Sequence, residues 1–171
     1  MFSFWRNKPS VQSGRDRVYP KPGAERIISM TELKENKEAV ESFKKAEESL
    51  EGAQKLLSEG LYDFSTSRAF FAIFYAVESA LKTRNLGYKS QTDVIKIFED
   101  NFVKSGIFSG DLQEYLIYAF ALRKKLKEFG KPGAISNEKA GELISMAREV
   151  IDTVGDYLKK EGYMAYYPSE L

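Results

Sequence analysis

Four basic side chains close to one another are the part of this sequence best suited to chemistry. They are Arg123, Lys124, Lys125 and Lys127, and Lys131 follows a few positions later. On a helix, Arg123 and Lys127 share a face, because residues four apart are neighbours there. Such a cluster can neutralise the phosphates of RNA or of a nucleotide. Alternatively, these cations only complement the negative end of the helix dipole near a helix C-terminus.

A second candidate, Arg68, lies beside the most apolar stretch of the chain. An arginine in such a place is seldom fully buried without a partner. Its planar guanidinium could hold a phosphate. The structural alternative is an ion pair with a buried or half-buried carboxylate. Asp63 is a poor same-face partner for such a pair, and Glu78 lies further along the chain, so both interpretations stay open.

The chain contains no histidine and no cysteine, which removes imidazole and thiol chemistry. Serine and cysteine hydrolase triads normally need a histidine base and are therefore excluded. The usual ligands of zinc and of other transition metals are also missing, so that only carboxylate sites for hard cations could form. We therefore expect no metal site and no cofactor.

The elements that must position these side chains are helices. Apolar residues recur at spacings of three and four, and no segment alternates with period two for long enough to form a strand. The predicted fold is all-α, an antiparallel up-and-down bundle of about five helices joined by short loops. The predicted helices cover, in order, residues 31–59, 62–84, 91–104, 111–129 and 137–160.

Polar residues mark where several of these helices begin. Thr31 is the predicted N-cap of the first helix, and Ser90 could cap the third with Asp93 at its third position. Either Ser136 or Asn137 caps the fifth helix. These caps define the expected starts.

The second predicted helix is apolar all round between Ala69 and Val77, which indicates that other helices surround it. Phe70, Phe71 and Tyr75 within this stretch could stack on nucleic-acid bases. In a helix of this kind, however, we expect all three in the core.

The length of 171 residues suits one domain. We expect a bundle over residues 31–162, an irregular N-terminal segment over 1–30 and an aromatic tail over 163–171. The net charge of +1 gives no overall sign of a nucleic-acid or membrane partner. The longest apolar run, 69–77, is too short to cross a membrane, and the first eight residues lack the features of a secretory signal. We therefore expect a cytoplasmic protein.

Several motifs resemble those of the HEPN domain, named from "higher eukaryotes and prokaryotes nucleotide-binding". The most specific is Ser-Arg-Ala-Phe-Phe-Ala-x-Phe over residues 67–74. It follows a leucine-rich helix that ends in Gly-x-Tyr at 60–62. Lys-Ser-Gln at 89–91 and Phe-Val-Lys-Ser-Gly at 102–106 complete the pattern. The resemblance covers roughly residues 35–160.

The resemblance implies a bundle of four or five helices that commonly dimerises. Many members are ribonucleases, often toxins, while others are inactive or pair with small nucleotidyltransferases. Active members carry an arginine and, four to six residues later, a histidine. Arg123 matches the arginine, but no histidine follows, and Glu128-Phe129 resembles the Asp-Tyr pair of inactive members, one residue further along. Gln91 replaces a second family histidine, so this chain resembles the branch without the catalytic dyad.

We therefore expect a non-catalytic domain that binds RNA, a nucleotide or a nucleotidyltransferase partner. Its binding residues would be Arg68, Arg123, Lys124, Lys127, Lys89 and Gln91.

Two alternatives stay open. One is a histidine-free ribonuclease of the toxin type, in which Glu128 or Gln91 replaces histidine as the proton carrier beside Arg123. A buried Glu128 with a raised pKa could serve in this way, whereas an exposed Glu128 would only pair with a nearby lysine. The other is a structural, antitoxin-like subunit without nucleic-acid affinity, which would assemble through Trp5 and the aromatic tail at Tyr166 and Tyr167.

Overall fold

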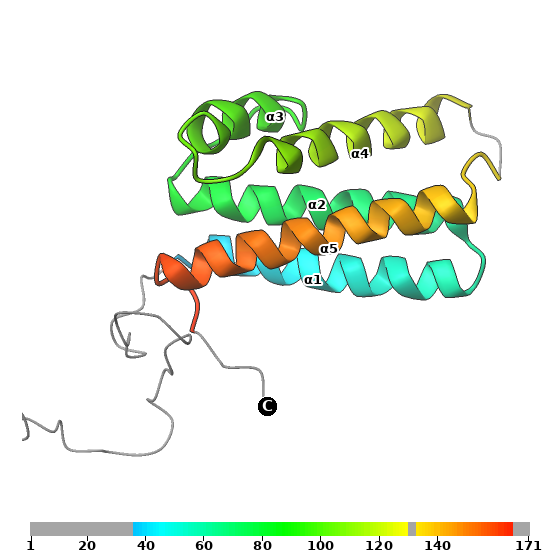
Figure 1. The fold of residues 1–171 in the computed structure, drawn as a ribbon, viewed down its shortest axis with the longest axis horizontal. Helices are drawn as coiled ribbons and strands as arrows, with labels where there is room; N and C mark the ends of the chain where they lie inside the picture. Colours follow the sequence, from blue (N-terminus) through cyan, green and yellow to red (C-terminus); the bar gives the residue numbers. More distant parts are fainter. Residues whose placement is uncertain (1–35, 130–132, 166–171) are drawn as a thin grey trace, which may run out of the picture.

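The computed structural model describes residues 36–129 and 133–165, and these residues form an all-α antiparallel bundle (Figure 1). The prediction of about five helices is confirmed. A π-helical turn, η3, directly continues the short third helix. The elements are α1 (Lys37–Ser58), α2 (Tyr62–Thr83), α3 (Asp93–Phe98), η3 (Glu99–Val103), α4 (Gly110–Phe129) and α5 (Asn137–Lys160).

The central helix is α2, which packs against α1, α4 and α5 (Figure 1). Its apolar surface is continuous because nearly every residue from Ala69 to Leu81 is buried. Small residues on α2 allow neighbouring helices to pack closely. Two serines of α2 also donate hydrogen bonds to backbone carbonyls of α1. Ser65 donates to the carbonyl of Ala53 (2.8 Å), and Ser79 donates to that of Ala39 (2.6 Å). The expectation that other helices surround α2 is therefore confirmed.

The prediction that the first helix begins near Thr31 is wrong. The helix begins at Lys37, and Asn36 is its N-cap. The Asn36 side chain accepts a hydrogen bond from the backbone N–H of Ala39 (3.0 Å), as an N-cap residue does. Thr31 itself lies outside the described residues.

The third helix also differs from its prediction, which was one helix over 91–104. The α-helical part begins at Asp93 and gives way to η3 after Phe98. The prediction that Ser90 caps this helix is wrong, because Thr92 is the N-cap and its side chain makes no capping hydrogen bond. Ser90 and Asp93 nevertheless exchange hydrogen bonds, since Ser90 Oγ accepts from the Asp93 N–H (3.3 Å) and an Asp93 carboxylate oxygen accepts from the Ser90 N–H (2.9 Å). Val94, Phe98 and Phe102 are buried, as a helical period predicts, whereas the widened turn itself is not revealed by a 3.6-residue period.

The remaining helices match their predicted ranges to within a residue. Ser136 caps α5 by accepting from the N–H of Lys139, one of the two caps considered. Asp63 at the start of α2 accepts hydrogen bonds from the N–H groups of Gly133 (2.8 Å) and Ile135 (3.0 Å). The Asp63 carboxylate thus ties the loop before α5 to the end of the α1–α2 hairpin.

The described part of the C-terminal tail packs on the bundle, because the hydroxyl of Tyr163 donates to the carbonyl of Thr83 (3.0 Å). Tyr166 and Tyr167 lie outside the described residues, as do Trp5 and the whole N-terminal segment 1–30. The proposed roles of these residues in assembly stay predictions.

Candidate nucleic-acid interface

One side of α2 carries aromatic rings that are only half covered. Phe71 and Tyr75, one turn apart, stack with their ring centroids 5.6 Å apart and an interplanar angle of 23°. Phe70 is fully buried beneath them and meets Phe71 edge to face at 5.2 Å. The expectation that these rings belong to the core holds for Phe70. It is wrong for Phe71 and Tyr75, which lie at the core's edge and remain partly exposed.

Arg123 on α4 lies over these rings. Its guanidinium carbon is 4.5 Å from the centroid of Phe70 and 4.3 Å from that of Phe71, which is cation–π geometry. Burial lowers the pKa of the Arg123 guanidinium from its ordinary value, and the neighbouring Tyr75 acts in the opposite direction. The guanidinium nevertheless stays charged, because arginine does not lose its proton in proteins.

The loop before α3 brings Gln91 to this arginine. Arg123 Nη1 donates to Gln91 Oε1 at 3.2 Å, although the two residues are far apart in the sequence. Within residues 36–129 and 133–165, no carboxylate forms an ion pair with Arg123. We call the group of Arg123, Gln91, Phe70, Phe71 and Tyr75 the Arg123 site.

Asp93 shapes the loop that carries Gln91. One carboxylate oxygen of Asp93 accepts from the backbone N–H groups of Lys89 (3.1 Å) and Ser90 (2.9 Å). The hydrogen bonds from Ser90, and then that from Lys89, lower the pKa of the Asp93 carboxyl. The Lys89 side chain is exposed, so its charge is available near the site.

Arg68 lies three residues before Phe71 and is exposed rather than buried. The Arg68 guanidinium passes over Gly52 on α1, where a Cβ atom would lie 3.4 Å from Arg68 Nε. The ion pair with a carboxylate, which was the structural alternative for Arg68, is absent among the described residues. Both acidic candidates are occupied elsewhere: Asp63 binds the loop before α5, and Glu78 lies in a separate polar network.

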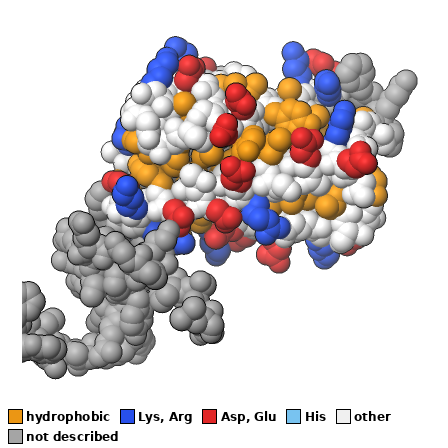
Figure 2. Space-filling view, in the orientation of Figure 1, with side chains coloured by type: hydrophobic (Ala, Val, Ile, Leu, Met, Phe, Trp, Pro, Cys, Tyr) orange, Lys and Arg blue, Asp and Glu red, His pale blue; other side chains and the backbone are white. Residues whose placement is uncertain are grey.

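The other predicted basic residues lie on the outer surface of α4. Lys124 pairs with Glu128 at 3.7 Å, and both side chains are more than half exposed. This is the exposed lysine pair that was the structural alternative for Glu128. Lys127 is exposed one turn after Arg123. In the space-filling view, several basic side chains and an acidic one lie near the C-terminal end of α4, and charges of both signs mix over the rest of this face (Figure 2).

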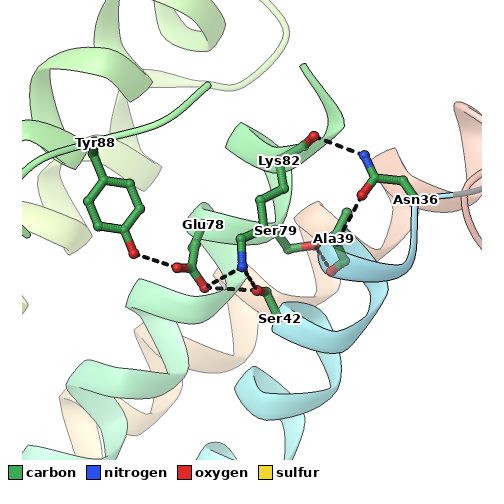
Figure 3. A network of polar contacts seen from close by, with 7 residues as sticks. All are labelled: Asn36, Ala39, Ser42, Glu78, Ser79, Lys82 and Tyr88. Atoms are coloured by element: carbon green, nitrogen blue, oxygen red, sulfur yellow. Dashed lines mark hydrogen bonds and ion pairs between the residues drawn. The ribbon is translucent and has the colours of Figure 1, made fainter. Parts of the chain in front are cut away.

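The sequence-based prediction missed a polar network inside the bundle (Figure 3). Its centre is Glu78, which is 8% exposed and follows the apolar stretch 69–77 of α2. Ser42 donates to its carboxylate at 2.8 Å, Lys82 lies 3.4 Å from the same oxygen, and the hydroxyl of Tyr88 donates to the other oxygen. An acidic residue within an apolar helix was the available signal, because a buried charge requires partners.

Two other predictions concern metals and membranes. No group of acidic residues suited to a metal ion occurs in the part of the chain that the structure describes. Among the helices of that same part, none is long and apolar enough to span a bilayer.

The fold is that of a small all-α domain, and Arg123 of the late helix α4 lies on the aromatic face of the central helix α2. The model of the HEPN domain matches residues 39–159, which is most of the chain. The chain therefore belongs to the HEPN family.

Relatives are found in archaea. A Methanocaldococcus jannaschii protein named "Putative toxin" is 28% identical over 131 residues, which cover 77% of this chain and 88% of that protein. Another protein of the same organism, also named "Putative toxin", is 32% identical over 116 residues, which cover 67% of this chain and 84% of that protein. A crystal structure of an archaeal HEPN homologue is similar with a TM-score of 0.56 and 18% identity, over 72% of this chain and 100% of that one. This last likeness shows the fold alone.

Proposed function

We propose that this domain binds single-stranded RNA at the Arg123 site and does not cleave it. The observation that carries the proposal is the position of the Arg123 guanidinium, which lies on Phe70 and Phe71 with a glutamine as its side-chain hydrogen-bond partner and no carboxylate among the described residues. Its positive charge is therefore partly desolvated and has no counter-ion within the described chain.

Such an arginine suits an incoming phosphate. A guanidinium offers several N–H donors in a fixed plane, of which one is occupied by Gln91, and it can hold a phosphate through two of the others. Its plane can also stack on a base, as arginine planes and aromatic rings do in complexes with single-stranded RNA. The half-exposed Tyr75 beside it adds a second stacking surface.

Further basic side chains can extend the contact along the RNA strand. Arg68, Lys89 and Lys127 are exposed and form no ion pair within the described residues. Lys124 contributes less, because Glu128 already offsets part of its charge. A mononucleotide has the same phosphate and base chemistry and would use only the Arg123 site.

The groups at this site favour binding without cleavage. Gln91 cannot carry a proton in catalysis, because its amide does not titrate near neutral pH. Glu128 is exposed and paired with Lys124, so it lacks the burial that the ribonuclease alternative required. The names of the two Methanocaldococcus jannaschii relatives nevertheless favour a second candidate function, RNA cleavage of the toxin type at the same site.

Fluorescence anisotropy with a labelled single-stranded RNA tests the proposal, with the same samples run on a gel. We expect the RNA to be bound and to stay intact. Arg123→Ala should weaken binding about tenfold or more, since stacking and charge-assisted contacts are each worth about 1–3 kcal/mol. Arg123→Lys should recover only part of this loss, because lysine keeps the charge without the planar guanidinium.

Arg148→Ala is the matched control, since Arg148 is an exposed arginine on α5 and the contacts that define the Arg123 site involve no residue of α5. This variant should bind RNA like the wild type. Cleavage of the RNA would contradict the proposal and favour the ribonuclease function instead. Neither binding nor cleavage would leave a protein partner, such as a nucleotidyltransferase, as the ligand to seek by pull-down. If a mononucleotide alone displaces the labelled RNA, the mononucleotide would be identified as the ligand of the Arg123 site.

A further inference from the structure

The polar network around Glu78 contains one residue that does not belong to the α1–α2 hairpin. Ser42 and Lys82 come from the two helices, and Lys82 Nζ also donates to Ser42 Oγ (2.8 Å). The amide of Asn36 donates to the backbone carbonyl of Lys82 (2.9 Å), which ties the start of α1 to the end of α2. Tyr88, in contrast, comes from the segment between α2 and α3 (Figure 3).

Tyr88 connects this segment to the bundle in two ways. Its hydroxyl donates to Glu78, and its ring meets Phe74 edge to face with centroids 6.0 Å apart. Phe74 in turn meets Tyr75 of the Arg123 site at 5.8 Å. Tyr88 therefore lies at the edge of the same aromatic group that supports Arg123.

The segment around Tyr88 is open on one side, because it borders a cleft of about 770 Å³. Chain that borders a cleft has fewer packed neighbours to hold its position than chain inside the core. The anchoring contacts of Tyr88 consequently matter more than they would at a packed position. The lining includes Asn36, Lys37, Lys82, Asn85, Leu86 and Gly87.

Gln91 follows Tyr88 by three residues. Between them, the N–H groups of Lys89 and Ser90 are held by the Asp93 carboxylate, so the short stretch from Tyr88 to Asp93 is fixed at both ends. A shift at Tyr88 would be passed through this stretch to the Gln91 side chain and to its contact with Arg123.

We propose that Glu78 and Tyr88 are positioning residues for the RNA site. The Tyr88–Glu78 hydrogen bond sets the segment that places the Gln91 amide oxygen on Arg123 and thereby orients the guanidinium for the ligand. This proposal rests on the proposed function. It assigns the buried carboxylate of α2 a role beyond holding α1 and α2 together.

Tyr88→Phe is the direct variant, because it removes the hydroxyl and keeps the ring on Phe74. Two controls separate positioning from stability. Ser42→Ala removes a different hydrogen bond to the same Glu78 carboxylate. Tyr115→Phe removes a tyrosine–glutamate hydrogen bond between α4 and α5, since the Tyr115 hydroxyl donates to Glu149 (3.1 Å).

The first measurement is the NMR resonance of the Gln91 side-chain amide in the free protein, together with the Arg123 guanidinium signal. Tyr88→Phe should shift both signals, and neither control should shift them. This measurement needs no ligand, so it tests the positioning role even if RNA binding itself fails. Unchanged Gln91 and Arg123 signals in Tyr88→Phe would overturn the proposal.

The second measurement is RNA affinity in a double-mutant cycle with Gln91→Ala. Tyr88→Phe should weaken binding by roughly three- to tenfold, the range expected from one misplaced hydrogen bond. In the Gln91→Ala background, the same change should have little further effect, because the residue through which Tyr88 acts is gone. Equal losses of affinity in Tyr88→Phe and Ser42→Ala, or full additivity with Gln91→Ala, would show a general effect on stability and contradict the proposal.

Discussion

Arg123 combines two environments that seldom occur together at a protein surface. Its guanidinium is partly desolvated by the aromatic rings below it, yet its side-chain hydrogen-bond partner is a neutral amide. An ion pair would already satisfy the charge and weaken its attraction for an outside anion. The glutamine instead contacts the group without neutralising it, and this difference is the reason for placing the proposed phosphate site at Arg123.

Tyr88 supplies a pH-dependent prediction at the scale of one residue. Burial, and then the hydrogen bond to Glu78, raise the pKa of the Tyr88 phenol above its ordinary value. The folded state thus favours the neutral phenol. The contribution of the neutral Tyr88 phenol to the stability of the fold is fully present below the ordinary tyrosine pKa of about 10. That contribution is lost as the pH rises further, through the raised pKa of the folded protein.

The ultraviolet absorbance of tyrosinate measures this titration. The difference between the wild-type curve and that of Tyr88→Phe isolates the Tyr88 phenol, which should titrate at a higher pH than free tyrosine. A difference curve that coincides with free tyrosine, or lies below it, would show that the phenol is not held as a donor to Glu78.

Single residues also show how far the sequence allowed the site to be predicted. Arg123 and Gln91 were both selected, and the structure brings them into contact. Phe71 and Tyr75 were assigned to the core because hydrophobic periodicity identifies an apolar residue but not whether a neighbouring helix covers it. The exposure of Arg68 and the network of Glu78 depend on the spacing between helices, which the sequence does not contain.

At the scale of the helices, the pairing of α1 with α5 requires a glycine. A Cβ atom on Gly155 of α5 would lie 2.9 Å from the Phe43 ring of α1, closer than real contacts allow. Gly141, on the same helix, has open space at the corresponding point. Substitutions of these two glycines can therefore be compared with each other.

Gly155→Ala should destabilise the bundle by about 1–3 kcal/mol, because the Phe43 ring must move within a packed core. Gly141→Ala should instead stabilise it by up to about 1 kcal/mol, as alanine is the better helix former. Chemical denaturation of both variants measures these free energies of unfolding. Equal effects of the two substitutions would mean that α1 and α5 do not meet as described.

The helix ranges were predictable in α2, α4 and α5, where the apolar periodicity ends at residues that interrupt a helix. They failed at α1, where Thr31 was the predicted cap and the side chain of Asn36 caps the helix. They failed again at the third helix, where a π turn follows Phe98. The Phe98, Phe102 and Phe108 rings stack on one another at this turn, a tertiary arrangement that a helical period does not describe.

At the scale of the whole molecule, the net charge of +1 means that any attraction to RNA must come from a local group of cations. Arg123 with Arg68, Lys89 and Lys127 can contact at most a few phosphates. For a single strand, the logarithm of affinity falls with the logarithm of salt concentration by about 0.7 per phosphate contact. We expect a total slope between about −1 and −3, measured by anisotropy in a salt series. A much steeper slope would indicate a larger basic surface than the described residues offer.

The central claim is that RNA lies on the face of α2 and α4 that carries Arg123, and photo-crosslinking tests it most directly. A single-stranded RNA that contains 4-thiouridine is irradiated with the protein, and the modified peptides are identified by mass spectrometry. The account predicts adducts within residues 68–75, 89–91 and 120–127, and their loss in Arg123→Ala. Adducts concentrated around Arg148 on α5, or no adducts at all, would contradict it.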